Sequence, residues 1–125
     1  MYWLLGRKSE LSSFNKILLY KQVLKPIWIY GIQLWGCTKR TNVNTIQGFQ
    51  NKVLRNIVNA PWYIRNKDIH RDLGIPLVAD EIRKFAYKHQ QRLIVHENEA
   101  ASKLLLPCLN RRLKRTKPED LVQLE

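Results

Sequence analysis

The first half of the sequence has almost no acidic residues. Residues 1–62 contain nine Lys or Arg side chains and a single acid, Glu10. Over the whole chain, 22 basic residues face 10 acidic ones, which gives a formal net charge of +12. A surface with this imbalance cannot neutralise itself through local ion pairs, and it favours a polyanionic partner.

Cysteine and histidine are also scarce. Cys37 and Cys108 lie far apart, neither has a Cys or a His at the spacing of metal ligands, and His70, His89 and His96 are equally scattered. This distribution speaks against a zinc site and against a disulfide framework. We therefore expect no metal and no cofactor in this chain, and we expect a reducing, intracellular setting in the nucleus or the cytoplasm.

Long uninterrupted hydrophobic runs are missing as well. The most apolar windows are broken by Lys21, Lys25 and Gln33, so we expect no membrane span. Hydrophobic residues nevertheless make up 45% of the 125 residues, which is enough for the core of one small domain.

Three explanations of the charge stay open at this point. A nucleic acid is the first, because the release of condensed counterions from phosphates rewards a basic surface. An acidic membrane surface is the second, and a soluble basic protein without such a partner is the third. A charge of +12 on so short a chain favours the nucleic acid.

Apolar residues recur at three- and four-residue spacing through most of the chain, and no alternating run is long enough for a central strand. We expect helices over residues 13–36, 41–60, 67–73, 79–95 and 99–106, and a final helical turn from Pro118. This pattern predicts an all-α fold, a small helical bundle of about four to six helices. We place this helical region at residues 1–109 and a basic, loosely ordered C-terminal tail at residues 110–125.

Several residues predict where these helices begin, bend and end. Ser12 or Ser13 is a suitable N-cap for the first helix, and Asn66 for the short helix before Gly74. Pro26 predicts a kink or a break inside the first helix, because it removes a backbone donor. Gly74 predicts the C-terminal end of its helix, where a left-handed residue is common.

Helical spacing also predicts which side chains are buried. In the first helix these are Ile17, Tyr20, Leu24, Ile27 and Leu34; in the second, Val43, Ile46, Phe49, Val53, Leu54 and Ile57; in the long helix 79–95, Ile82, Phe85, Ala86, His89 and Leu93. The opposite, solvent-facing side of the second helix is predicted to carry Asn44, Gln47, Asn51 and Arg55.

The sequence His70-Arg71-Asp72-Leu73 resembles the catalytic loop of a protein kinase, in which the aspartate receives the proton of the substrate hydroxyl. The kinase pattern needs an asparagine five residues after the aspartate, where this chain has Leu77, and a glycine-rich loop, which is missing. We interpret the four residues as part of a short capped helix without a catalytic role.

Basic residues at helical spacing are candidates for contacts with phosphates. Lys84, Lys88 and Arg92 lie four apart and so form one stripe of a helix. An ordinary solvated face, with local ion pairs to Asp80 or Glu81, explains the same spacing. The other candidates for backbone contacts are Lys39, Arg40, Lys52 and Arg55 in or near the second helix, and Arg111, Arg112, Lys114 and Arg115 in the tail. The tail also fits a nuclear import signal, but backbone attraction without base specificity is the simpler interpretation.

Aromatic side chains fall into two groups. Trp28 and Trp35 lie seven residues apart on one helical face, as packing residues do. Trp62 and Tyr63 follow Pro61 in a predicted loop, and they are the better candidates for stacking on nucleic-acid bases.

Five segments of the chain, taken in order, carry a resemblance to a known family. They are residues 2–9 (YWLLGRKS), 24–36 (LKPIWIYGIQLWG), 60–63 (APWY), 69–76 (IHRDLGIP) and 111–115 (RRLKR). Together they resemble the C-terminal part of the reverse transcriptases of non-LTR retrotransposons, in particular jockey-like mobile elements. The resemblance covers nearly the whole chain.

The resemblance implies a thumb and post-thumb region, a helical module that holds the primer–template duplex beside the palm. In this family, magnesium binding and nucleotidyl transfer belong to palm aspartates further upstream, and this sequence has no adjacent Asp pair. We therefore expect a fragment of an RNA-directed DNA polymerase that lacks the catalytic palm and is no enzyme on its own. Its expected partners are the backbone of RNA or of an RNA–DNA duplex and the palm region of the parent polymerase.

An alternative of a different class also fits the sequence. The apolar run from Pro26 to Gly36 could be exposed, and the chain would then be an inert or self-associating interaction fragment without an independent function. A stand-alone enzyme is disfavoured, because no complete set of catalytic residues is evident.

Overall fold

The computed structural model describes residues 2–106 and 116–122, and these residues form helices joined by short connections. The all-α prediction is confirmed for this part of the chain, and further one-turn helices come in addition to the longer ones predicted. The helices are α1 (Tyr2–Leu5), α2 (Ser13–Leu19), a π-helix (Tyr20–Leu24), α3 (Lys25–Ile29), α4 (Ile32–Trp35), α5 (Arg40–Val58), α6 (Asn66–Leu73), α7 (Val78–Ile94), α8 (Glu99–Ser102), a 3₁₀ turn (Lys103–Leu105) and α9 (Pro118–Val122). None of the helices in these two stretches has the length and hydropathy needed to cross a membrane.

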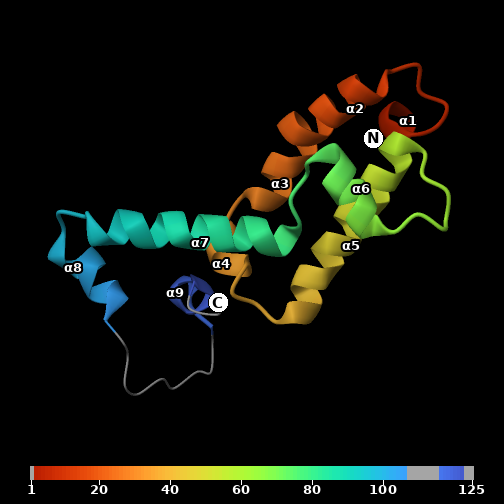
Figure 1. Cartoon of the computed structure of the whole chain (residues 1–125). Coiled ribbons are helices and arrows are strands. Elements are labelled where there is room, and N and C mark those ends of the chain that lie inside the picture. The colour runs from red at the N-terminus through yellow and green to blue at the C-terminus, as the bar shows by residue number, and fades with distance from the viewer. Residues whose placement is uncertain (1, 107–115, 123–125) are drawn as a thin grey trace.

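The long helix α5 connects two groups of helices (Figure 1). Helices α1, α2 and α6 pack against α5 on one side of the molecule. Helix α7 also contacts α5, and α4 and α9 both lie against α7. Helix α8 lies at the far end of α7.

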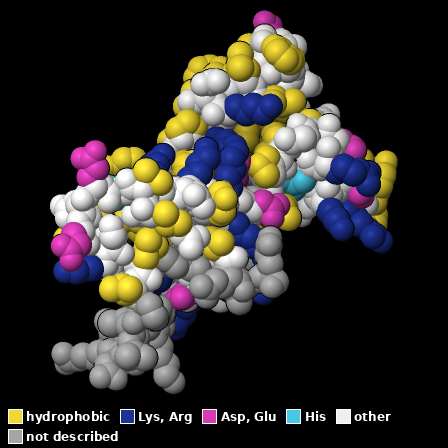
Figure 2. Space-filling view, turned by 60° about the vertical axis from the view of Figure 1, so that its left-hand side comes forward, with side chains coloured by type: hydrophobic (Ala, Val, Ile, Leu, Met, Phe, Trp, Pro, Cys, Tyr) yellow, Lys and Arg dark blue, Asp and Glu magenta, His cyan; other side chains and the backbone are white. Residues whose placement is uncertain are grey.

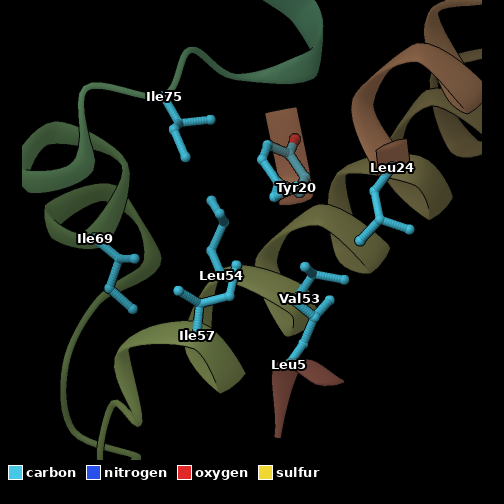
Figure 3. Packing of buried hydrophobic residues seen from close by; sticks show 8 residues of the cluster. All are labelled: Leu5, Tyr20, Leu24, Val53, Leu54, Ile57, Ile69 and Ile75. Atoms are coloured by element: carbon cyan, nitrogen blue, oxygen red, sulfur yellow. The ribbon is translucent and has the colours of Figure 1, made fainter. Parts of the chain in front are cut away.

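The first hydrophobic core lies around the C-terminal half of α5 (Figure 3). Tyr20 and Leu24 approach α5 from one side, and Ile69 and Ile75 approach it from the other. Burial of each such side chain stabilises the fold by about 1.5–3 kcal/mol. The buried members of this core are Leu5, Tyr20, Leu24, Val53, Leu54, Ile57, Ile69 and Ile75.

The second core joins α3, α4 and α7. Its buried members are Trp28, Ile32, Val78 and Ile82. The rings of Trp28 and Trp35 meet edge to face with centroids 6.5 Å apart, so the prediction that both tryptophans are packing residues is confirmed. Leu121 of α9 also packs against this core, and the final helical turn predicted at Pro118 is present there.

Pro26 does not break its helix. The preceding turn is a π-helix in which the Lys25 amide bonds to the carbonyl of Tyr20, five residues earlier, and α3 then continues through Pro26 to Ile29. The wider turn accommodates the missing donor and the bulk of the proline ring. The chain breaks instead at Gly31, which has a left-handed φ of 67°.

Three side chains that were predicted to be buried are exposed. Ile27 is 67% and Leu34 is 75% exposed, and Phe49 also faces solvent. For Ile27 and Leu34, the π-helix and the turn at Gly31 change the phase of the helix, so that positions on one ideal helical stripe no longer share a face. This explanation does not apply to Phe49, which lies in the uninterrupted helix α5. Phe85 and His89, also predicted as core residues, are half-buried.

Polar side chains of α5 were predicted to face solvent, but two of them point inward. Gln47 Oε1 accepts a hydrogen bond of 2.8 Å from the backbone amide of Val78. Asn51 Oδ1 lies 2.9 Å from Nε2 of the buried His70, whose Nδ1 lies 2.8 Å from the carbonyl oxygen of Ile75. Because a carbonyl oxygen can only accept, Nδ1 is the donor there, and the contacts of His70 are structural.

The ends of the other helices lie near their predicted positions, but the predicted N-cap Asn66 is wrong. Helix α6 begins at Asn66 itself, its N-cap is Arg65, and Oδ1 of Asn66 accepts a hydrogen bond from Arg55. Ser12 accepts a hydrogen bond from the amide of Asn15, as an N-cap does. The short helix α6 ends at Gly74 with φ of 60°, and α7 differs from its predicted bounds by one residue at each end. Gly36, which ends α4, lies so close to α7 that an added Cβ would be 3.0 Å from Ile82.

Candidate nucleic-acid interface

The first group of candidate cations lies on the C-terminal half of α5. Lys52 and Arg55 line a hollow of about 290 Å³ together with Asn56 and Asn59. Arg7 lines the same hollow, and sequence periodicity did not select it, because it lies in the loop after α1. Three cations from two separate parts of the chain thus meet at one hollow.

The loop that carries Arg7 is held in place by a buried lysine. Lys16 of α2 donates a hydrogen bond of 3.0 Å from Nζ to the carbonyl oxygen of Gly6. A lysine is rarely buried unless its ammonium is paired, and here a backbone carbonyl receives it. Lys16 therefore fixes the position of the residue just before Arg7.

Arg55 has its guanidinium group directed at the loop that follows α5. Nη1 donates to the carbonyl oxygen of Ile64 at 2.7 Å and to Oδ1 of Asn66 at 2.9 Å. Nη2 donates to the carbonyl oxygen of Pro61 at 2.7 Å. The planar fork of arginine suits this double contact. A phosphate contact by Arg55 stays a prediction, and any phosphate would share the guanidinium with these acceptors.

The second group, Lys39 and Arg40, lies at the start of α5. Both side chains are exposed, and the first turn of the helix contains no acid. Cations at a helix N-terminus are unfavourable next to the positive end of the dipole, so a bound anion would relieve this repulsion. The twelve residues from Arg40 to Lys52 correspond to about 18 Å along the helix axis.

The third group lies on α7. Lys84 and Lys88 line a hollow of about 510 Å³ between α7 and α9, and Arg83, which the spacing did not select, lines it too. Nζ of Lys88 also lies 5.8 Å from the centre of the Phe85 ring. Arg92, nearer the end of α7, is exposed.

Several acidic side chains form ion pairs with basic residues other than the candidate cations. Glu81, which was considered as a local partner of Lys84 or Lys88, forms an ion pair of 2.6 Å with Lys25 of α3. Asp68 and Asp72 each lie 3.4 Å from the guanidinium of Arg71. Figure 2 shows Lys and Arg side chains on one face in several groups, with hydrophobic side chains between them.

Two aromatic residues lie in the loop next to the first group. Trp62 is 90% and Tyr63 is 69% exposed, and their rings meet edge to face with centroids 6.0 Å apart. The prediction that these rings are available for stacking agrees with their exposure.

Part of the predicted interface lies outside the described residues. This applies to Arg111, Arg112, Lys114 and Arg115 and to the predicted boundary between residues 109 and 110. Within residues 2–106 and 116–122, no group of three or more His, Cys, Asp or Glu side chains is placed to hold a metal ion.

Known proteins match 90–99% of the chain at 39–45% sequence identity, and each is an RNA-directed DNA polymerase of a mobile element. The chain is a homologue of one segment of these polymerases. It spans only 12–14% of their length.

The particular relatives come from Drosophila. The chain is 45% identical over 121 residues to the probable RNA-directed DNA polymerase from transposon X-element of Drosophila melanogaster, covering 97% of this chain and 13% of the relative. It is 40% identical over 131 residues to the RNA-directed DNA polymerase from mobile element jockey of Drosophila funebris, covering 98% of this chain and 14% of the relative. No protein-family model matches the chain, and no solved structure matches it.

Proposed function

We propose that this chain is the thumb-like segment of a jockey-like reverse transcriptase and that it binds the sugar–phosphate backbone of RNA or of an RNA–DNA duplex. The observation that carries the proposal is the meeting of Arg7, Lys52 and Arg55 at one hollow, on a chain with a net charge of +12. Contacts of this kind position a nucleic acid without reading its sequence.

The spacing of the cation groups supports an extended nucleic acid as the ligand. Arg40 and Lys52 are separated by about 18 Å along the axis of α5, and phosphates of one strand advance by about 3.4 Å per step along a duplex. About five steps of a duplex therefore separate the two groups. A small anion would occupy one group only, whereas a nucleic acid can contact both.

We place nucleotidyl transfer, with its magnesium, in other parts of the parent polymerase. The relatives are about seven times longer than this chain, in keeping with the 13–14% that it covers. In this proposal the segment is not catalytic on its own, and the palm region of the polymerase is its second partner.

The proposal is tested by fluorescence anisotropy with a labelled RNA–DNA duplex. The logarithm of the affinity should fall linearly with the logarithm of the salt concentration between about 50 and 200 mM. Lys52→Ala should reduce that slope by about 0.9, because one phosphate contact is lost. Lys103→Ala is the matched control, since Lys103 pairs with Glu99 at 3.1 Å on α8. An affinity that does not change with salt would refute backbone binding.

A second candidate function is supported by a specific observation. Large apolar side chains are exposed along α2, α3 and α4, among them Phe14, Ile27 and Leu34. Such a surface favours association with a protein, including a second copy of this chain.

A further inference from the structure

The loop between α5 and α6 is fixed at several points. Asn59 ends α5 in a left-handed conformation, and the amide of Ala60 bonds to the carbonyl of Arg55 at 3.0 Å. The guanidinium of Arg55 then holds the carbonyl oxygens of Pro61 and Ile64. The amide of Asn59 also bonds to the carbonyl of Arg55, so four backbone groups of a seven-residue loop are bound to one residue of the preceding helix.

The side chains of this loop point in two directions. Ala60 and Ile64 pack against the first hydrophobic core, whereas Trp62 and Tyr63 are largely exposed. Burial of either aromatic side chain against a ligand would be favourable, so two adjacent exposed rings on an anchored loop are suited to binding one. The loop is held by several hydrogen bonds and by contacts with the core, and both rings are nevertheless exposed to solvent.

The surface beside the rings is basic. Ala60 lines the hollow that Arg7 and Lys52 also line, so these cations lie next to one end of the loop. Arg65 and Lys67 follow at the other end, and both are exposed. The two rings therefore lie between cations on both sides along the chain.

We propose that Trp62 and Tyr63 stack on unpaired bases of a single-stranded nucleic acid whose phosphates contact Arg7 and Lys52. This inference rests on the proposed function and adds the class of ligand that the loop binds. Stacking needs no sequence-specific hydrogen bond, because every base has a π-face. A single strand offers such faces, whereas the interior bases of a duplex are already stacked on one another.

The fixed loop makes this platform effective. A loop backbone that is already in place loses little conformational freedom when a base binds, so more of the stacking energy appears as affinity. The edge-to-face arrangement, with an interplanar angle of 81°, leaves the two rings in different orientations. Successive bases of a strand can then stack on one ring each.

The experiment compares two labelled strands with the same number of phosphates, an RNA strand with bases and an abasic backbone. The full chain should bind the strand with bases about tenfold more tightly for each ring engaged. Trp62→Ala combined with Tyr63→Ala should remove this preference and leave the dependence on salt unchanged. Trp62→Phe, which keeps a ring, should retain most of the preference.

A matched control uses another exposed tryptophan. Trp3→Ala changes a side chain that is 76% exposed but lies in α1, and it should keep the preference for bases. Circular dichroism checks that each variant keeps its helix content, which is expected because the changed rings lie outside both cores.

The possible outcomes separate the two proposals. Equal binding of the base-containing and abasic strands by the unmodified chain would overturn stacking while backbone binding stands. Binding of neither strand, and of no duplex, would overturn both proposals. Unchanged preference in the double variant would also overturn stacking by these rings, and it would leave a protein surface as the explanation of their exposure.

Discussion

Arg55 connects α5 to the loop that follows it, and three of its hydrogen bonds are between 2.7 and 2.9 Å. Arg55→Lys is expected to lower the free energy of unfolding by about 1–3 kcal/mol. A single ammonium cannot replace a fork that bridges two carbonyl groups, so at least one acceptor loses its partner. Urea denaturation followed by far-UV circular dichroism measures this change.

Lys52 is the control for this prediction, because it lies one turn away on the same helix and is exposed. Lys52→Ala should change stability by no more than about 0.5 kcal/mol but should weaken nucleic-acid binding. If the two variants were equally stable, the fork of Arg55 would not be what holds the loop.

Tyr20 gives the protein a pH dependence at alkaline pH. Its hydroxyl is fully buried and accepts a hydrogen bond of 2.9 Å from Nε2 of Gln50. Burial raises the pKa of this hydroxyl above its ordinary value of 10.0. The unfolded chain therefore releases the proton at a lower pH than the folded protein, and the stability from this group is complete below pH 10 and is lost as the pH rises through the folded pKa.

The comparison is with Tyr20→Phe, which leaves one amide hydrogen of Gln50 without its buried acceptor and should cost about 1–3 kcal/mol near neutral pH. Above about pH 10 the difference between the two proteins should shrink, since only the unmodified chain loses stability through Tyr20. Urea denaturation at several pH values measures it. A difference that stays constant with pH would contradict the prediction.

Between helices, the ion pair of Lys25 and Glu81 joins α3 to α7. The Glu81 side chain is only 3% exposed, whereas that of Lys25 is 23% exposed. Lys25→Met should destabilise the fold by about 2–4 kcal/mol, because it leaves a buried carboxylate without its partner. Glu81→Gln should cost less, since it removes the buried charge itself.

The double variant, Lys25→Met with Glu81→Leu, tests this account by urea denaturation. It should recover most of the lost stability, because a well-packed apolar pair avoids the cost of desolvating two charges. Additive losses in the double variant would show that the two side chains act independently.

The sequence predicts some helices well and others poorly, and the difference has a physical cause. Helices α5, α6 and α7 have sustained apolar spacing and clear end signals such as Gly74, and their predicted bounds agree within two residues. The run from α2 to α4 contains a π-turn before Pro26 and a left-handed Gly31. These change the helical phase, and a 3.6-residue period cannot represent such a change.

For the candidate site, the sequence predicts which residues take part better than it predicts how they are arranged in space. The cations of α5 and the exposed rings of Trp62 and Tyr63 could be selected from charge and from the position after Pro61. The fork of Arg55 could not, because its acceptors are backbone carbonyls whose positions depend on the folded loop. The sequence also does not predict the position of Arg7, because only the tertiary structure places this residue beside α5.

The molecule as a whole combines two surfaces that respond to salt in opposite directions. One is the basic surface that we propose binds nucleic acid, and such binding should weaken as salt rises. The other consists of apolar side chains exposed along α2, α3 and α4, including Phe14, Ile27 and Leu34. Two copies of a chain with a charge of +12 repel each other, and salt screens this repulsion over about 10 Å at 0.1 M.

We therefore expect the free protein to self-associate more strongly at high salt than at low salt, measured by size-exclusion chromatography with light scattering. Ile27→Lys combined with Leu34→Lys should shift it to the monomer, because charges then replace two side chains of the apolar surface. Leu104→Lys adds a charge at another exposed apolar position and is the control. A protein that stays monomeric at all concentrations and salt levels would contradict association through this surface. The Lys52→Ala variant should still self-associate, while its binding to the RNA–DNA duplex should be weakened. This result would show that the two surfaces act separately. The apolar side chains would then be available to a protein while the basic surface binds a nucleic acid.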